Sequence, residues 1–322
     1  MAAAADRSLV LVTATVAEPA LARLRERCRV EVLPPSPPLT ALTLAPYAEA
    51  QGWVSHNGQP VTADVLDVLP QLRVVANVAV GYDNVDVAEL SRRGVTFTNT
   101  PGVLDAAVAE LTIGMVIGLL RQIVPADRHV RSGAWHEEPF RLTTDVHGKT
   151  LGILGMGRIG SRIAKVAQAL DMTVLYSNRR RNPEAEDAGL ADYREREALF
   201  RESDVVVLTV PLTDQTRRSV GTRELAVMKP SAYLVNVARG AVVDEAALVD
   251  ALESGSIAGA ALDVMDIEPL PPESPLCDLD QVLLLPHIGS ATVETRRAMA
   301  ELAVDNVLAV LDGREPVTPV RP

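Results

Sequence analysis

Three side chains suited to acid–base chemistry follow three separate apolar runs in the second half of the chain. Arg239 comes after AYLVNVA, Glu268 lies shortly after AGAALDV, and His287 ends VLLLPH. The ligand crevice of a doubly wound sheet lies at the carboxyl ends of its strands, so these side chains could converge on one small molecule. A guanidinium can bind a carboxylate, and an imidazole can exchange a proton near neutral pH. Taken singly, each also has an ordinary structural role, so the spacing alone leaves both interpretations open.

A glycine-rich turn precedes this set. The segment LGILGMGRIG places Gly155, Gly157 and Gly160 between an apolar run and a segment with helical periodicity. We expect the first glycine to permit a tight turn, the second to let the backbone approach a pyrophosphate, and the third to let the helix pack closely. The helix N-terminus would add free N–H groups and a positive dipole end. The motif therefore predicts a dinucleotide site; a glycine-rich turn without a ligand is the alternative.

The next apolar run ends in TVLYSNRRRNP. An NAD-selective site usually has Asp or Glu about 20 residues beyond the glycines, and here that position is Asn178, beside Ser177, Arg179, Arg180 and Arg181. A carboxylate would repel a ribose 2′-phosphate, whereas guanidinium groups bind one. The sequence therefore predicts NADP, with NAD possible; the alternative is a solvated arginine run that tolerates either cofactor. The residues expected to bind the dinucleotide are Gly155, Gly157, Arg158, Ile159, Gly160, Ser177, Asn178, Arg179, Arg180, Val210, Pro211, Val237, Ala238, Asp263 and Gly289.

Short apolar runs alternate with helical segments on both sides of one long helical stretch. This alternation predicts an α/β fold with parallel sheets. Before the stretch come LVLVTATV, RVEVL, GWV, RVVANVAV and VTFTNTP with helices over 18–27, 62–69 and 85–93; the stretch covers about 105–129; after it come TLGILG, TVLYS, DVVVLTV, AYLVNVA, AGAALDV and VLLLPH with helices over 158–170 and 244–253. A last helix over 292–311 follows the second sheet, so it could return to the first unit and make that domain discontinuous.

Composition limits the possible classes. A chain of 322 residues suggests two domains, and 48% hydrophobic but only 3% aromatic residues indicate a core of aliphatic side chains. A net charge of −11 without a long basic run argues against nucleic acid. Cys28 and Cys277 lack metal-ligand spacing, so we expect no metal site and no disulfide. The N-terminus resembles a short tail rather than a signal, and no apolar run spans a bilayer, so we expect a cytoplasmic protein without membrane contact.

Several motifs in order resemble the D-isomer-specific 2-hydroxyacid dehydrogenase family over nearly the whole chain. The matching stretches are VAVGYDNVD, TNTPGVLDAAVAEL, LGILGMGRIG, VPLTDQTR, NVARGAVVDEAAL, ALDVMDIEPLPPESPL and LLPHIGSAT. The resemblance implies two Rossmann/flavodoxin-like doubly wound parallel-sheet domains with a cleft between them. Residues 1–103 plus 290–322 would form the substrate domain, and 104–289 the dinucleotide-binding domain. It also implies a homodimer, an Arg239/Glu268/His287 catalytic set, and a substrate carboxylate bound by the backbone of Val80 and Gly81.

Within the family, the arginine-bearing turn and RSGAWHEEPF look most like glyoxylate/hydroxypyruvate reductases, in which the residue matching Trp135 reaches toward the partner subunit's site. Two departures leave the substrate open: Met265 replaces a more usual aromatic, and VSHNGQP near Ser55 does not define a pocket. The alternatives are another D-2-hydroxyacid dehydrogenase of lactate, phosphoglycerate or phosphonate type, and a nucleotide-sensing corepressor-like binding protein.

The resemblance suggests a mechanism for a small 2-keto or 2-hydroxy acid. The amides of Val80 and Gly81, together with Arg239, would bind its carboxylate, and Arg239 would also polarise the C2 carbonyl. His287 would donate the proton when hydride reaches C2, and the Glu268 carboxylate would favour the imidazolium form.

Overall fold

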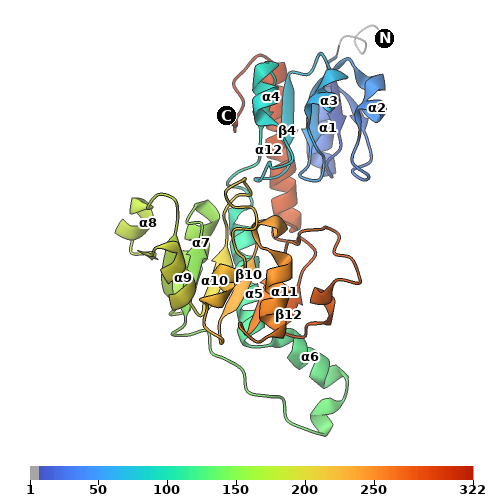
Figure 1. Ribbon diagram of the computed structural model, residues 1–322. Coiled ribbons are helices and arrows are strands. Elements are labelled where there is room, and N and C mark those ends of the chain that lie inside the picture. The colour runs from blue at the N-terminus through green and yellow to red at the C-terminus, as the bar shows by residue number, and fades with distance from the viewer. Residues whose placement is uncertain (1–6, 322) are drawn as a thin grey trace. The chain divides into compact units, whose positions relative to one another are not determined.

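The computed structural model describes residues 7–321 and divides into two compact units (Figure 1). The first unit extends to Leu104 and resumes at Thr292, and the second is Asp105–Ala291. These junctions lie within two residues of the boundaries expected from the sequence. The expected N-terminal tail over 1–6 and the last residue, Pro322, lie outside the described residues.

The first unit contains a five-stranded parallel sheet. The strand order is β2-β1-β3-β4-β5, so the winding reverses between β1 and β3, as in flavodoxin-like folds. Its strands are β1 (Leu9–Val12), β2 (Arg29–Val32), β3 (Ala50–Ser55), β4 (Val74–Asn77) and β5 (Thr96–Thr98), and its helices are α1 (Glu18–Arg27), α2 (Ala41–Leu44), α3 (Ala63–Asp67), α4 (Val87–Arg92), α12 (Val293–Leu311) and the 3₁₀ turn η1 (Ala45–Tyr47). The last helix, α12, packs against α1, β3 and β4, so the chain returns to this unit as the sequence predicts.

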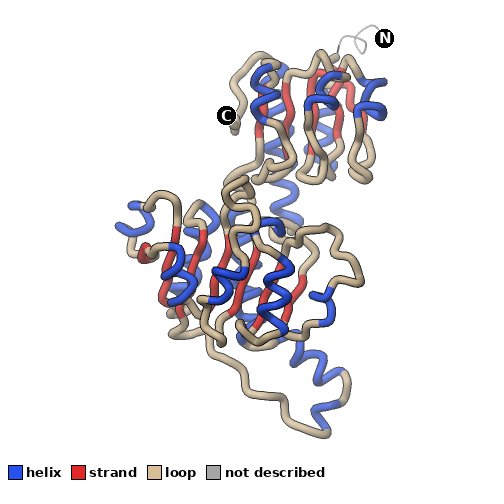
Figure 2. Tube along the Cα trace, in the orientation of Figure 1, coloured by secondary structure: helices blue, strands red, loops and turns tan. Residues whose placement is uncertain are grey.

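The second unit contains a seven-stranded parallel sheet with the order β12-β11-β10-β9-β6-β7-β8. Its strands are β6 (Thr150–Leu154), β7 (Thr173–Ser177), β8 (Asp192–Tyr193), β9 (Val205–Leu208), β10 (Tyr233–Asn236), β11 (Gly259–Leu262) and β12 (Val282–Leu284). Its helices are α5 (Asp105–Leu120), α6 (Ile123–Arg131), α7 (Arg158–Ala169), α8 (Pro183–Asp187), α9 (Arg196–Glu202), α10 (Thr222–Ala226) and α11 (Glu245–Glu253), with 3₁₀ turns η2 (Ala134–His136), η3 (Gly240–Val242) and η4 (Pro275–Asp278). Helices cover both faces of the sheet (Figure 2). The predicted α/β fold with two doubly wound parallel sheets is confirmed.

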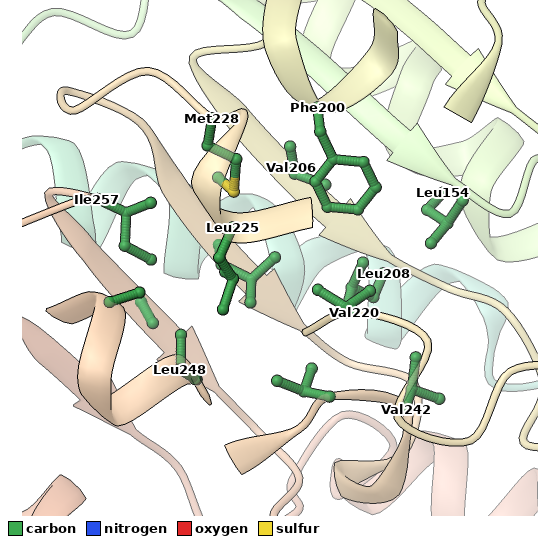
Figure 3. Packing of buried hydrophobic residues seen from close by; sticks show 14 of the residues in the cluster. Leu154, Phe200, Val206, Leu208, Val220, Leu225, Met228, Val242, Leu248 and Ile257 are labelled. Carbon is green, nitrogen blue, oxygen red and sulfur yellow. The ribbon is translucent and has the colours of Figure 1, made fainter. Parts of the chain in front are cut away.

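Aliphatic side chains form the core of the second unit, as the low aromatic content predicts. Strands β9 and β10 are buried along nearly their whole length, and Phe200 is the one aromatic ring in the cluster on one face of the sheet. Figure 3 shows Phe200 among Leu154, Val206 and Leu208. Burial on both faces explains why these strands read as continuous Val and Leu runs without alternation.

The prediction of one long helix over 105–129 is wrong, because this stretch forms two helices. Helix α5 ends at Leu120, Gln122 adopts a left-handed conformation with φ 48°, and α6 begins at Ile123 at an angle of 59° to α5. Pro125 supplies the reason, since a proline inside a helix clashes with the carbonyl four residues before it, here that of Arg121. Among residues 7–321 no single helix is long and apolar enough to span a bilayer, and only the bent α5–α6 pair passes that test of length and composition.

Candidate functional site

The sequence-predicted site residues of the second unit lie at the carboxyl edge of its sheet. Strand β6 comes first in this unit, and its two neighbours are β7 and β9, so the winding reverses between β6 and β9. Such a reversal opens a crevice at the carboxyl ends of the strands. The loops after β6, β7, β9, β10, β11 and β12 therefore meet at the edge where an α/β sheet ordinarily binds its ligand.

The three glycines after β6 differ in what surrounds them. Gly155 has φ +112°, and an added Cβ would lie 2.8 Å from the backbone of Thr209 and Val210. An added Cβ on Gly160 would lie 2.5 Å from the carbonyl oxygen of Gly155. A Cβ on Gly157 would meet no protein atom within 4 Å. The first and third glycines are thus required by packing, whereas the second faces open space beside the start of α7, as a turn that admits a pyrophosphate requires.

Asn178, the position expected to face the ribose, binds the backbone of the phosphate loop through its side chain. Its Oδ1 accepts a hydrogen bond from the Met156 amide at 2.7 Å, and its Nδ2 donates to the Met156 carbonyl at 3.3 Å. The Nδ2 of Asn182 donates to the same carbonyl at 3.0 Å. The side chain therefore fixes the backbone between Gly155 and Gly157, a role that spacing alone did not reveal.

The three arginines after β7 divide into two groups. Arg181 is bound within the protein: it forms an ion pair with Glu186 at 2.5 Å, and its guanidinium lies 5.2 Å from the ring centre of Tyr193. Arg179 and Arg180 are exposed, and within residues 7–321 neither side chain has a hydrogen-bond or ion-pair partner. Two guanidinium groups are therefore available to an anion beside the phosphate loop.

Glu268 and His287 form a hydrogen-bonded pair. The Nδ1 of His287 lies 2.7 Å from Oε2 of Glu268, and the Met265 amide donates to Oε1 at 3.1 Å. Burial raises the pKa of Glu268. The pKa nevertheless lies below its ordinary value, because the hydrogen bond to His287, the His287 charge, the Met265 N–H and the Arg239 charge all lower it. The carboxylate is therefore ionised when it binds the imidazole, and the charge of Arg239 acts on it. The structure thus places Glu268 and His287 in contact, and Arg239 follows β10 at the same edge of the sheet.

Gly240 determines how closely the Arg239 loop can lie to the Glu268 loop. An added Cβ on Gly240 would fall 1.8 Å from the Met265 carbonyl carbon and 2.3 Å from the Asp266 nitrogen. No side chain fits there, so only glycine permits this close contact between the two backbones. The glycine directly after Arg239 is visible in the sequence, but the segment that packs against it, Met265–Asp266, can be identified only from the fold.

Asp263 anchors the turn that carries His287. It is buried at the end of β11, and its two carboxylate oxygens accept the amides of Ile288 and Gly289, each at 2.7 Å. His287 itself has φ 54°, a left-handed conformation that is costly for a residue with a side chain and needs support from its surroundings. Burial raises the pKa of Asp263; the two amides and His287 oppose this shift, Glu268 adds to it, and the pKa stays above its ordinary value.

The remaining predicted dinucleotide residues line the same edge. Ser177 ends β7, Val210 and Pro211 follow β9, Val237 and Ala238 follow β10, and Arg158 and Ile159 begin α7. Arg158 lies 3.3 Å from the carboxylate of Asp105, whose Oδ1 is buried and has no hydrogen-bond partner among the described residues. This acidic partner of the phosphate-loop arginine was not identified from the sequence.

The predicted carboxylate-binding pair lies in the first unit, in the loop after β4. The carbonyl of Val80 accepts a hydrogen bond from Asn99 Nδ2 at 2.8 Å, and that of Gly81 accepts one from Asn77 Nδ2 at 3.1 Å. The amide nitrogens of Val80 and Gly81 donate to no acceptor in the described part of the chain. Two amide donors are therefore left for an anion, and two asparagines missed by sequence reasoning hold their backbone.

Trp135 lies on an arm of the second unit formed by α6, η2 and the loop to β6. This arm projects from the seven-stranded sheet and is drawn in green in Figure 1. Helix α6 has no buried residue, and the side chains of Ile123, Val130, Trp135 and Leu142 are exposed, Leu142 at 98%. Exposed apolar side chains gathered on one segment are typical of a surface that contacts another protein.

Comparison with known proteins gives concordant matches. Residues 113–289 match the model of the D-isomer specific 2-hydroxyacid dehydrogenase, NAD binding domain. The chain is 45% identical over 317 residues to a glyoxylate reductase of Thermococcus gammatolerans, covering 96% of this chain and 94% of that protein. A glyoxylate reductase of Aeropyrum pernix is 44% identical over 321 residues, which cover 96% of this chain and 95% of that protein. The structure of an NADPH-dependent glyoxylate/hydroxypyruvate reductase from Sinorhizobium meliloti, in complex with NADP and malonate, has a TM-score of 0.90 at 36% identity, covering 98% of this chain and 97% of that one.

Proposed function

Because the chain belongs to the D-isomer specific 2-hydroxyacid dehydrogenase family, we propose that it reduces small 2-keto acids of the glyoxylate/hydroxypyruvate type with NADPH. The observation that carries the proposal is the hydrogen bond between Glu268 and His287 at the carboxyl edge of a dinucleotide-type sheet, where the loop that carries Arg239 also lies. A binding protein of this fold would need the glycine-rich turn but not this proton-transfer pair. The relatives named glyoxylate reductase support the substrate class.

The proposed reaction assigns one role to each of these groups. In the first unit, the amides of Val80 and Gly81 bind the substrate carboxylate. In the second, Arg239 adds a guanidinium that pairs with the carboxylate and polarises the C2 carbonyl. The loops around Gly157 would hold the nicotinamide dinucleotide, which when bound would supply the hydride for C2. His287 donates its proton to the alkoxide oxygen, and the Glu268 carboxylate holds the imidazolium in place through Nδ1, which leaves Nε2 as the donor.

The preference for NADPH rests on Arg179 and Arg180. Among residues 7–321 neither guanidinium group has a protein partner. The position where an NAD-selective site has a carboxylate is occupied by Asn178, whose side-chain amide is bound to the phosphate loop. A ribose 2′-phosphate would therefore meet two cations and no carboxylate. The NADPH-dependent relative from Sinorhizobium meliloti agrees with this assignment.

We also propose that the arm around Trp135 binds a second copy of the chain. Its exposed apolar side chains would be covered in a homodimer, and Trp135 would then reach the partner's site. Leu142→Glu should convert the dimer to a monomer, as measured by light scattering after size-exclusion chromatography. A monomeric wild-type protein would refute this assignment.

The decisive experiment is a set of steady-state measurements with glyoxylate, hydroxypyruvate and pyruvate against NADPH and NADH. We expect turnover of the first two with NADPH, and a loss of at least about 10²-fold in kcat for His287→Ala with cofactor binding retained. Arg179→Ala with Arg180→Ala should raise the KM for NADPH far more than that for NADH. Arg25→Ala, which removes an exposed arginine in α1 of the other unit, is the matched control. Equal weakening of both cofactors would contradict the assignment of the arginines.

A further inference from the structure

Two peptide groups at the proposed carboxylate site are held through their carbonyl oxygens. The Thr100 amide donates to the Ala79 carbonyl at 3.0 Å, and Asn99 Nδ2 donates to the Val80 carbonyl at 2.8 Å. In a trans peptide the C=O of one residue and the N–H of the next lie in one plane and point in opposite directions. The bond from Thr100 therefore fixes the direction of the Val80 N–H, and the bond from Asn99 fixes that of the Gly81 N–H.

The two bonds differ in how they depend on side chains. Thr100 uses its backbone, so almost any residue there would preserve that bond. Asn99 uses its side-chain amide, and a side chain without an N–H at this length cannot replace it. The orientation of the Gly81 N–H is therefore under the control of one side chain that makes no contact with substrate in this scheme.

Asn99 is in turn held by the C-terminal segment. The hydroxyl of Thr318 donates to the Asn99 carbonyl at 2.6 Å and accepts from Nδ2 of Asn306 at 2.8 Å. The Thr318 amide donates to Oδ1 of Asn306 at 2.9 Å. Asn306 is fully buried in α12, and the segment continues along β5, where the Val320 amide donates to the Phe97 carbonyl at 2.9 Å. A buried helix thus fixes Thr318, and Thr318 fixes the backbone at residue 99.

We propose that Asn99 is a positioning residue for the substrate carboxylate, and that Thr318 in the C-terminal segment holds Asn99 in the orientation this requires. The proposal rests on the proposed function, because it takes the Val80 and Gly81 amides as the carboxylate-binding donors. Without the side-chain amide of Asn99, the Val80–Gly81 peptide plane is free to rotate. One of the two donors then no longer faces the anion.

The test compares Asn99→Ala, Thr318→Val and their double variant. Loss of one hydrogen bond of this kind should raise the KM for glyoxylate by roughly ten-fold in Asn99→Ala and roughly three-fold in Thr318→Val. The dissociation constant of oxalate, measured by calorimetry on the NADPH-saturated protein, should rise by the same factors. The KM for NADPH should stay within about two-fold of wild type, because the dinucleotide loops belong to the other unit. The double variant should bind oxalate and glyoxylate no more weakly than Asn99→Ala alone, because both substitutions act through the bond from Asn99 to the Val80 carbonyl.

A merely structural role predicts a different pattern. In that case the KM values for glyoxylate and NADPH would rise together, or only the melting temperature would fall, and either result would overturn the proposal. Thr40→Val, which removes the capping hydroxyl of α2 in the same unit, controls for the loss of a threonine hydroxyl. Failure of the proposed function can be told apart from failure of this proposal. If the wild-type protein reduces no 2-keto acid but binds oxalate, and Asn99→Ala weakens that binding, the positioning role of Asn99 stands. A wild type that binds no oxalate refutes it.

Discussion

In the proposed mechanism, replacement of Glu268 by Gln isolates the contribution of the carboxylate charge to proton transfer. Gln has nearly the same size and can still bond to the imidazole, so the change removes charge with little change of shape. The carboxylate lies 2.7 Å from His287 Nδ1. Because its pKa is held below the ordinary value, against the opposing effect of burial, the Glu268 carboxyl group is negatively charged at neutral pH. Its charge therefore favours the protonated form that the reduction requires.

The size of the effect follows from the geometry. A hydrogen bond between charged groups contributes about 1.5–3 kcal/mol. The side chains of His287 and Glu268 are 31% and 35% exposed, so solvent screening favours the lower part of that range, about 1.5–2 kcal/mol. The corresponding loss of kcat/KM for glyoxylate reduction at neutral pH is about ten- to thirty-fold.

The pH dependence gives a sharper test than the rate. Reduction needs imidazolium and fails as pH rises, so the alkaline limb of the kcat/KM profile should move to lower pH in Glu268→Gln. Oxidation of the hydroxy acid needs neutral imidazole, so its acid limb should move to lower pH as well. Both profiles can be measured from NADPH absorbance across pH 5 to 10. Glu273→Gln, an exposed glutamate in the same loop, should leave both limbs in place. A uniform loss of rate with unmoved limbs would refute the electrostatic role.

Four further substitutions test how the site is held. Gly160→Ala places a Cβ at 2.5 Å from the Gly155 carbonyl and should lower both the melting temperature and the NADPH affinity; Gly157→Ala, whose Cβ meets no protein atom, should weaken NADPH binding with the melting temperature retained. Asp263→Ala leaves two amides without their acceptor, so we expect a loss of about 1–3 kcal/mol in the free energy of unfolding by urea titration and a fall in kcat. Gly240→Ala forces two backbones apart and should reduce kcat more than the KM for NADPH, and an unchanged kcat would contradict the packing argument.

The carboxyl groups of Glu268 and Asp263 should change the pH dependence of the free energy of unfolding in opposite directions. The folded-state pKa of Glu268 is depressed, so its contribution to stability is present above the pKa of the unfolded chain and is lost as pH falls through the folded-state value. The pKa of Asp263 is raised, so ionisation of this group costs stability as pH rises through its folded-state value.

The sequence predicted the elements whose pattern is local. Helix α1 has the predicted bounds, and the runs before Arg239 and His287 are the strands β10 and β12. Strand β8 was missed because two residues carry no periodicity, and the break between α5 and α6 was missed although Pro125 marked it. The candidate catalytic residues could be proposed from the sequence because each follows a strand, and parallel topology brings the strand ends to one edge.

The residues that hold the site could not be predicted in the same way, because their partners are distant in sequence and lie on the backbone. Asp263 binds amides 25 and 26 residues away, and Thr318 binds a carbonyl 219 residues away. A backbone group has the same chemistry at every position, so no residue type in the sequence marks the acceptor or donor that a buried side chain will find. This explains why Asn178 reads as a ribose contact from its spacing and yet binds the phosphate loop. The candidate catalytic groups can be predicted from the order of the strands, whereas their orientation depends on side-chain bonds to backbone that only the folded chain reveals.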